Sequence, residues 1–151
     1  NMLLSGFRLA QAEGLGAGRV IAGTGDRVRR PGVHSLGYVP EADKSALYAG
    51  ARAVVLVSKH EGFGLPPLEA LRYGTPSIVS DLPIFRSTLG DAAMRVPPGD
   101  PTALAAALVR LEHDDAARTR LVGRGKPVLK RFSWKRSASA TYRVIKEAVD
   151  A

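Results

Sequence analysis

The chain has 151 residues, of which 45% are hydrophobic, and it carries a formal net charge of +8 with no cysteine. This size and hydrophobic content favour one domain with one core. The lack of cysteine excludes disulfides and thiolate chemistry and fits a reducing compartment, so the expected location is the cytoplasm. The sequence contains no run of about 18 apolar residues, so no membrane-spanning helix is expected. The histidines, His34, His60 and His113, lack paired ligand spacing, so no metal site is expected.

The apolar periodicity predicts short strands that alternate with helices. In chain order it predicts a helix over 2–12, strands over 19–22 and 33–36, a helix over 40–49, a strand over 53–57, a helix ending at 73, a strand over 76–79, a helical turn over 82–89, a strand over 93–96, and helices over 101–111, 114–130 and from 133 onward. Short apolar strands between helices favour a buried parallel sheet. The expected fold class is α/β, a Rossmann-like doubly wound parallel sheet flanked by helices.

Several helix ends have recognisable signals. Pro40 is expected to open a helix, since a first-turn residue needs no N–H, and Gly74 is expected to stop one. Asp100 followed by Pro101 is a strong start signal, and Asp114 is expected to cap the next helix.

The last predicted helix has one apolar face. Trp134, Ala138, Tyr142, Ile145 and Val149 are spaced by 4, 4, 3 and 4 residues, which places them on one side of a helix. The basic residues of this segment lie off that face.

Positive charge is concentrated late in the chain. Between Arg110 and Lys146 there are eleven basic and three acidic residues. A solvated face, a peripheral contact with a membrane or anionic acceptor, or nucleic-acid binding would each explain this excess. Because no nucleic-acid motif or interleaved aromatic residues accompany it, no nucleic-acid partner is expected.

The segment over 60–70 contains the most informative pattern. An apolar strand leads into a glycine turn and then into a helix, an arrangement that gathers unpaired backbone N–H groups and favours an anion. Two carboxylates, Glu61 and Glu69, frame this turn. Acids beside an anion site indicate a ligand that also carries hydroxyl groups, as a nucleotide sugar does.

The same segment resembles a known family. Glu61 and Glu69 form an E-x7-E pair within E-G-F-G-L-P-P-L-E-A, which is similar to the signature of family-4 retaining glycosyltransferases of the group 1 type. Further matching words are G-Y-V at 37–39, L-Y-A-G-A at 47–51, G-T-P at 74–76, S-D at 80–81, V-P-P-G-D at 96–100 and F-S-W at 132–134. The resemblance implies the donor-binding, C-terminal half of a two-domain GT-B enzyme, and the wording at 82–86 is mannosyltransferase-like.

The resemblance implies specific roles near the turn. Glu69 would accept hydrogen bonds from the ribose hydroxyls of a nucleoside-diphosphate sugar, and Glu61, the catalytic assignment, would accept from hydroxyls of the donor sugar. The backbone N–H groups expected to meet the sugar and the diphosphate are those of Gly62, Phe63, Gly64 and Leu65.

Other implied contacts come from earlier turns. Tyr38 and Val39 lie in the segment that holds the base, and Gly23 and Gly25 lie in a turn near the phosphates. The resemblance implies a metal-independent enzyme with no cofactor, for which the nucleoside-diphosphate sugar is the donor substrate.

Each assignment has a structural alternative. Glu69 could be a solvated helix residue, Glu61 a helix cap, and Phe63 a core residue. Tyr38 and Val39 could serve packing alone, Gly23 and Gly25 could simply form turns, and His60 reads as a surface neighbour.

The resemblance also implies that parts of the site lie outside the sequence. The family's arginine and lysine at the diphosphate would precede Asn1, together with the first strand of the domain, and Arg8 does not match either. A glutamate often found near the helix after Asp81 is Ser87 here. The expected organisation is a donor-binding domain over 1–132 and a helix over 133–151 that crosses toward an absent N-terminal domain, which would bind an acceptor glycan or lipid-linked glycan.

The leading hypothesis is therefore hexosyl transfer from a nucleoside-diphosphate sugar to an acceptor hydroxyl, with this chain inactive by itself. The alternatives are a non-catalytic or regulatory GT-B relative that keeps the pocket, and an anionic-surface binder that depends on the basic third of the chain.

Overall fold

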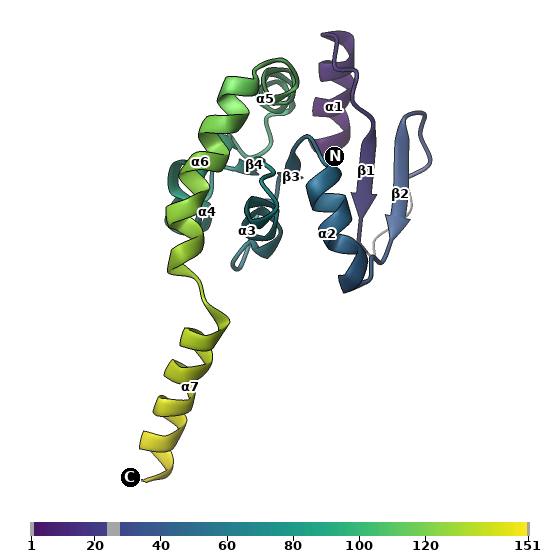
Figure 1. Cartoon of the computed structure of the whole chain (residues 1–151). Coiled ribbons are helices and arrows are strands. Elements are labelled where there is room, and N and C mark those ends of the chain that lie inside the picture. Colours follow the sequence, from purple (N-terminus) through teal and green to yellow (C-terminus); the bar gives the residue numbers. More distant parts are fainter. Residues whose placement is uncertain (1, 24–27, 151) are drawn as a thin grey trace.

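The computed structural model describes residues 2–23 and 28–150 and contains parallel strands flanked by helices (Figure 1). The elements in chain order are α1 (Met2–Ala12), β1 (Arg19–Ala22), β2 (Val33–Gly37), α2 (Glu41–Gly50), β3 (Val54–Leu56), α3 (Leu65–Arg72), β4 (Ser77–Ser80), α4 (Pro83–Thr88), a 3₁₀ turn (Gly90–Ala92), β5 (Ala93–Val96), α5 (Pro101–His113), α6 (Asp115–Arg131) and α7 (Trp134–Val149). The helices and strands predicted from the sequence are confirmed, with ends that shift by one or two residues. The α/β class with parallel strands is confirmed as well.

The strands form two parallel sheets. One has the order β1-β2 and the other the order β3-β4-β5. Pairing in the second sheet is regular, with Val55 opposite Ile78 and Ile78 opposite Met94. β1 and β3 each have a hydrogen-bonded neighbour on one side only, and Figure 1 shows the two groups of strands standing apart, with α2 between them in this view.

The open edges explain why two strands are less buried than their apolar sequences predict. The strand over 19–22 was expected to be buried, but Val20 is 56% exposed. All three residues of β3 are only half-buried, whereas every residue of β4, which has a neighbour on both sides, is buried. A strand without a second neighbour leaves part of its side chains in contact with solvent.

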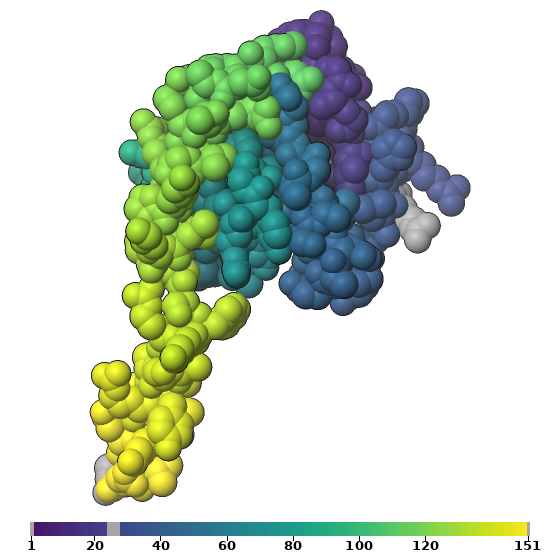
Figure 2. Space-filling view, viewed as in Figure 1, coloured from purple at the N-terminus to yellow at the C-terminus, as the bar shows by residue number. Residues whose placement is uncertain are grey.

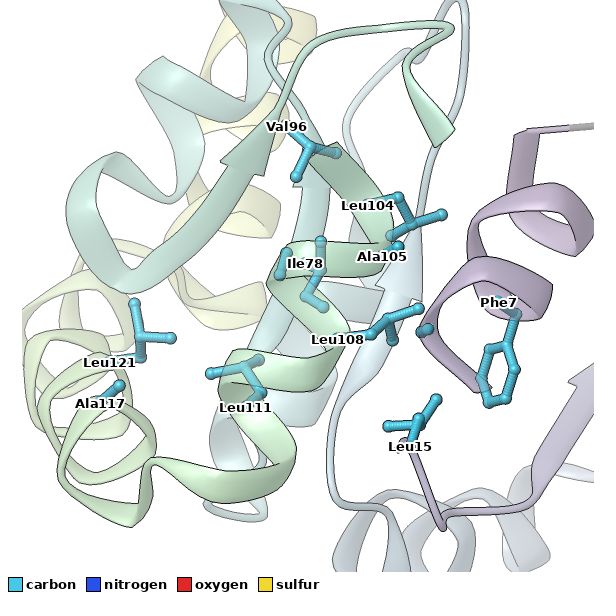
Figure 3. Packing of buried hydrophobic residues seen from close by; sticks show 12 residues of the cluster. Phe7, Leu15, Ile78, Val96, Leu104, Ala105, Leu108, Leu111, Ala117 and Leu121 are labelled. Atoms are coloured by element: carbon cyan, nitrogen blue, oxygen red, sulfur yellow. The ribbon is translucent and has the colours of Figure 1, made fainter. Parts of the chain in front are cut away.

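The core lies on both faces of the three-stranded sheet. Successive strand residues point to opposite faces, so Ile78 and Val79 enter different clusters. Ile78 and Val96 pack with α1 and α5, and Figure 3 shows them beside Leu104 and Leu108. The cluster on the other side joins Val79 to α3, α4 and α6, and its buried members are Leu68, Leu71, Phe85, Leu89, Ala92, Ala93 and Val128.

Local signals fix the starts of the last helices. The Asp100 carboxylate accepts hydrogen bonds from the N–H groups of Thr102 and Ala103, both at 2.9 Å. Asp114 accepts one from Ala117 at 2.7 Å. Both predicted caps are confirmed, and each is worth about 1 kcal/mol. Pro40 occupies the N-cap position of α2 rather than its first turn.

α7 projects away from the rest of the chain (Figures 1 and 2). None of its residues is buried, and its apolar face is open to solvent, with Trp134 79% exposed and Tyr142 68% exposed. Among the residues that the structure describes, no helix combines the length and the apolar character needed to cross a membrane.

Candidate functional site

The turn between β3 and α3 is shaped by Gly64. This residue is the N-cap of α3, with φ of 80°, in the left-handed region that side chains rarely adopt. A Cβ at this position would overlap the Phe85 ring, which belongs to the buried core. Glycine is therefore required here by the backbone conformation and by packing against α4, before any ligand is considered.

The turn presents backbone donors at its surface. Within the residues that the structure describes, the N–H groups of Phe63, Gly64 and Leu65 have no hydrogen-bond partner. The next two residues are Pro66 and Pro67, which have no N–H to offer. The donors therefore come from the loop and the first residue of α3, and not from the whole first turn of the helix.

Glu61 is half-buried and lies at the start of this turn. Its Oε1 accepts a hydrogen bond from the Gly62 N–H at 3.0 Å, so that N–H already has a partner. α3 has no side chain bonded at its N-terminus, so Glu61 is not a helix cap. Phe63 is 41% exposed and its ring packs edge-on against Phe132, with centroids 5.5 Å apart.

Glu69 lies one turn into α3 and is not a solvated helix residue. It is half-buried, and the Tyr48 hydroxyl of α2 donates a hydrogen bond to its Oε2 at 2.7 Å. The other carboxylate oxygen has no hydrogen-bond partner among the described residues and remains able to accept.

Tyr48 is itself firmly held. Its ring stacks on that of Tyr73, with centroids 5.9 Å apart and an angle of 20° between the planes. The Thr75 hydroxyl donates to the Tyr48 carbonyl at 2.5 Å. Burial, followed by the hydrogen bond to Glu69, raises the pKa of Tyr48, so the hydroxyl keeps its proton to a higher pH than an ordinary tyrosine does.

Sequence reasoning missed Tyr48 as a site residue. It noted the residue only as part of the L-Y-A-G-A word and of an expected helix. The available signal was its place in a word that accompanies the E-x7-E pair, but the sequence does not show which face of α2 meets α3.

Lys44 of α2 forms an ion pair within its own helix. Its Nζ donates to Glu41 at 2.6 Å, and this bond, with smaller contributions from the charge of Glu69 and from Tyr38, raises the pKa of Lys44. The Tyr38 side chain is 74% exposed, so it is not a packing residue, and Val39 is half-buried.

The earlier glycine turn meets the same segment through the backbone. The N–H of Gly23, directly after β1, donates to the carbonyl of Gly37, directly before Tyr38, at 2.8 Å. This N–H therefore bonds the end of β1 to the end of β2. Gly25 lies outside the described residues.

No metal-binding cluster is present in the described part of the chain, which contains no group of three or more His, Cys, Asp or Glu side chains that could hold an ion. His60 is exposed. Ser87 at the edge beyond Asp81 donates its hydroxyl to the carbonyl of Ile84 at 2.9 Å.

Comparison with known proteins identifies the family of this chain. A model described as Glycosyl transferases group 1 matches residues 28–127. The chain belongs to this family. The match includes the turn, α2, α3 and the segment at Tyr38, so the resemblance read from the E-x7-E pair is confirmed at the level of the family.

Curated relatives of this group 1 glycosyltransferase chain are mannosyltransferases. It is 38% identical over 114 residues to O-antigen chain mannosyltransferase B of Escherichia coli, covering 76% of this chain and 30% of that protein. It is 38% identical over 115 residues to phosphatidyl-myo-inositol mannosyltransferase of Mycobacterium leprae, covering 74% and 31%. The chain spans about a third of the length of these relatives.

Solved structures share the fold. Sucrose-phosphate synthase of Thermosynechococcus elongatus has a TM-score of 0.81 at 24% identity, over 97% of this chain and 42% of that one. Anabaena HepE in complex with UDP-glucose has a TM-score of 0.72 at 14% identity, over 95% of this chain and 53% of that one. Together with the family match, these likenesses show the fold of GT-B glycosyltransferases.

Proposed function

We propose that this chain is the donor-binding part of a retaining glycosyltransferase that moves a hexosyl group from a nucleoside-diphosphate sugar to an acceptor hydroxyl. The observation that carries the proposal is the pair Glu69 and Glu61 at the two ends of one turn, with unbonded N–H groups between them. The mannosyltransferase relatives favour mannose as the sugar. The solved HepE complex contains a nucleoside-diphosphate sugar, which supports that donor class.

Glu69 is proposed to bind the ribose. Its free oxygen and the remaining lone pair of Oε2 can accept from two neighbouring hydroxyls, and hydrogen bonds to a charged group are worth about 1.5–3 kcal/mol each. The carboxylate is already half-buried and bonded to Tyr48, so it needs little further ordering to bind these hydroxyls.

Glu61 and the turn are proposed to bind the sugar and the diphosphate. The free N–H groups of Phe63, Gly64 and Leu65 are suitable donors to phosphate and hydroxyl oxygens. For Gly62 to join them, Glu61 must release its N–H, and the carboxylate would then be free to accept from a sugar hydroxyl. On this proposal the hydrogen bond from the Gly62 N–H to Glu61 exists only when no sugar nucleotide is bound.

Base and phosphate contacts are proposed at the neighbouring strand ends. The exposed Tyr38 ring and the side chain of Val39 would contact the base, and Gly23 and Gly25 would form the turn near the phosphates. The Tyr38 ring is 74% exposed and is therefore accessible to a base.

Catalysis is proposed to depend on orientation and electrostatics, without a metal ion or cofactor. The cations for the leaving diphosphate and the acceptor-binding surface would come from the rest of a longer protein, and this chain alone would turn over no substrate. The acceptor would be a glycan or lipid-linked glycan, at a cytoplasmic site with peripheral membrane contact.

The proposed domain organisation is a donor-binding domain over 1–132, completed by a preceding strand, and a helix over 133–151 directed to a second domain. The open edges of β1 and β3 support a strand between them. The exposed apolar face of α7 supports a missing partner surface.

The ribose role is tested by titrating the chain with UDP, GDP, UDP-glucose and GDP-mannose in a calorimeter. Glu69→Ala should weaken the tightest of these at least about tenfold, because two charge-assisted hydrogen bonds are lost. Glu147→Ala, on the exposed α7, is the matched control and should bind as the unmodified chain does. Unchanged affinity in Glu69→Ala would refute the proposal.

A further inference from the structure

Tyr48 joins two helices at the proposed ribose site. Its hydroxyl, carried by α2, lies 2.7 Å from Oε2 of Glu69 on α3, and both side chains are half-buried. The hydroxyl has a single O–H group, which donates its hydrogen bond to the carboxylate. The bond therefore fixes one oxygen of Glu69 without neutralising its charge.

The position of the hydroxyl is determined from two directions. Tyr73 is the C-cap residue directly after α3, and its ring stacks on that of Tyr48. Thr75, which is 2% exposed, holds the Tyr48 carbonyl through its own hydroxyl. Because both anchors follow α3 directly, Tyr48 is held relative to the helix that carries Glu69.

A glutamate side chain has three rotatable bonds, so an unrestrained carboxylate samples many positions and must be ordered when a ligand binds. The Lys44 Nζ is bonded to Glu41, and the described residues show no ion pair between Lys44 and Glu69, so Lys44 does not provide this restraint. Among the described residues, Tyr48 is the hydrogen-bond partner that the Glu69 carboxylate has.

We propose that Tyr48 is a positioning residue that holds the Glu69 carboxylate ready for the ribose hydroxyls and thereby sets the preference for ribose over deoxyribose. The inference rests on the proposed function of Glu69. It assigns to Tyr48 no contact with the ligand, so its effect must depend on whether the ligand carries the hydroxyls that Glu69 binds.

The test compares ribonucleotides with nucleotides that lack both hydroxyls. The nucleotide used is whichever of UDP and GDP binds the unmodified chain more tightly. This nucleotide and its 2′,3′-dideoxy counterpart are each titrated into the unmodified chain and into Tyr48→Phe, which keeps the ring and its stacking. Affinity for the ribonucleotide should fall about three- to tenfold, the cost of ordering one flexible side chain. Affinity for the dideoxynucleotide should change less than about twofold.

Matched variants separate positioning from general damage. Tyr73→Phe removes a hydroxyl without a partner in the described structure from the other ring of the same stack, and it should bind both nucleotides normally. In a Glu69→Ala background, Tyr48→Phe should have no further effect. If Tyr48→Phe does not fold, as judged by circular dichroism, Thr75→Val should show the same selective loss to a smaller degree.

Equal losses for both nucleotides, or none, would overturn the positioning role and leave Tyr48 a structural residue. If the unmodified chain does not discriminate between the two nucleotides, or if Glu69→Ala still discriminates, the proposed ribose role of Glu69 fails first, and the inference about Tyr48 fails with it.

Discussion

Gly64 illustrates how a residue at a candidate site can be required for a structural reason. The sequence resemblance assigns the N–H of Gly64 only to contact with the sugar and the diphosphate. The structure shows that Gly64 faces Phe85, 21 residues later in the chain, with a backbone conformation that only glycine adopts easily. A ligand is not needed to explain this glycine.

A matched pair of variants tests this account. Gly64→Ala should lower the free energy of unfolding by about 2–5 kcal/mol, combining the cost of a left-handed alanine with overlap in the core. Gly62→Ala, whose Cβ would meet no atom within 4 Å, should change it by less than about 0.5 kcal/mol. Urea denaturation measures both, and similar values for the two variants would contradict the explanation.

Residue-level predictions succeeded where the cause is local. Asp100 and Asp114 bond to N–H groups within three residues, so a short sequence window contains the whole interaction. Tyr48 and Glu69 are 21 residues apart and meet through helix packing, so a sequence window cannot reveal the bond. The candidate site was therefore recognised by its motif, but the residue that holds it was not.

At the scale of elements, the sequence predicted the helices and strands but not how the strands group. Periodicity reports which residues face a core, and it gave the right elements. Grouping depends on neighbours far away in the chain or outside it, which explains why β1 and β3 were expected to be buried and are partly exposed.

The open face of α7 leads to an expectation about its stability. A helix with no buried residue has little to stabilise it beyond its own hydrogen bonds, and such segments open at a small cost in free energy. In hydrogen exchange, amides of α7 should exchange at least about a hundredfold faster than those of β4. Equal protection of α7 and β4 in a sample that light scattering shows to be monomeric would count against this expectation.

At the scale of the whole molecule, two parallel sheets with open edges at β1 and β3 fit the proposal that a strand from a longer protein joins them. The match covers about a third of the length of the two mannosyltransferase relatives. The two groups of strands would then form one continuous sheet with β2 and β5 at its edges, which is the single parallel sheet expected from the sequence.

This leads to a measurement on a longer chain. Extending the protein by its natural preceding residues should raise the melting temperature by more than about 5 °C, since a central strand pairs on both sides and covers half-buried apolar residues such as Val55. An extension of the same composition in scrambled order is the control. Equal melting temperatures for the natural and scrambled extensions would refute the strand proposal.

The two prolines that follow Leu65 have a consequence for the thermodynamics of binding. Pro66 and Pro67 restrict the backbone of the unfolded chain as well as that of the folded one, so the start of α3 loses little conformational entropy on folding. Little further entropy is then lost there when a ligand binds. An anion that binds at the turn therefore meets N–H donors whose helical side is already rigid. Replacing both prolines by alanine would add two N–H donors at the start of α3. It would also increase the conformational entropy that this segment loses on folding.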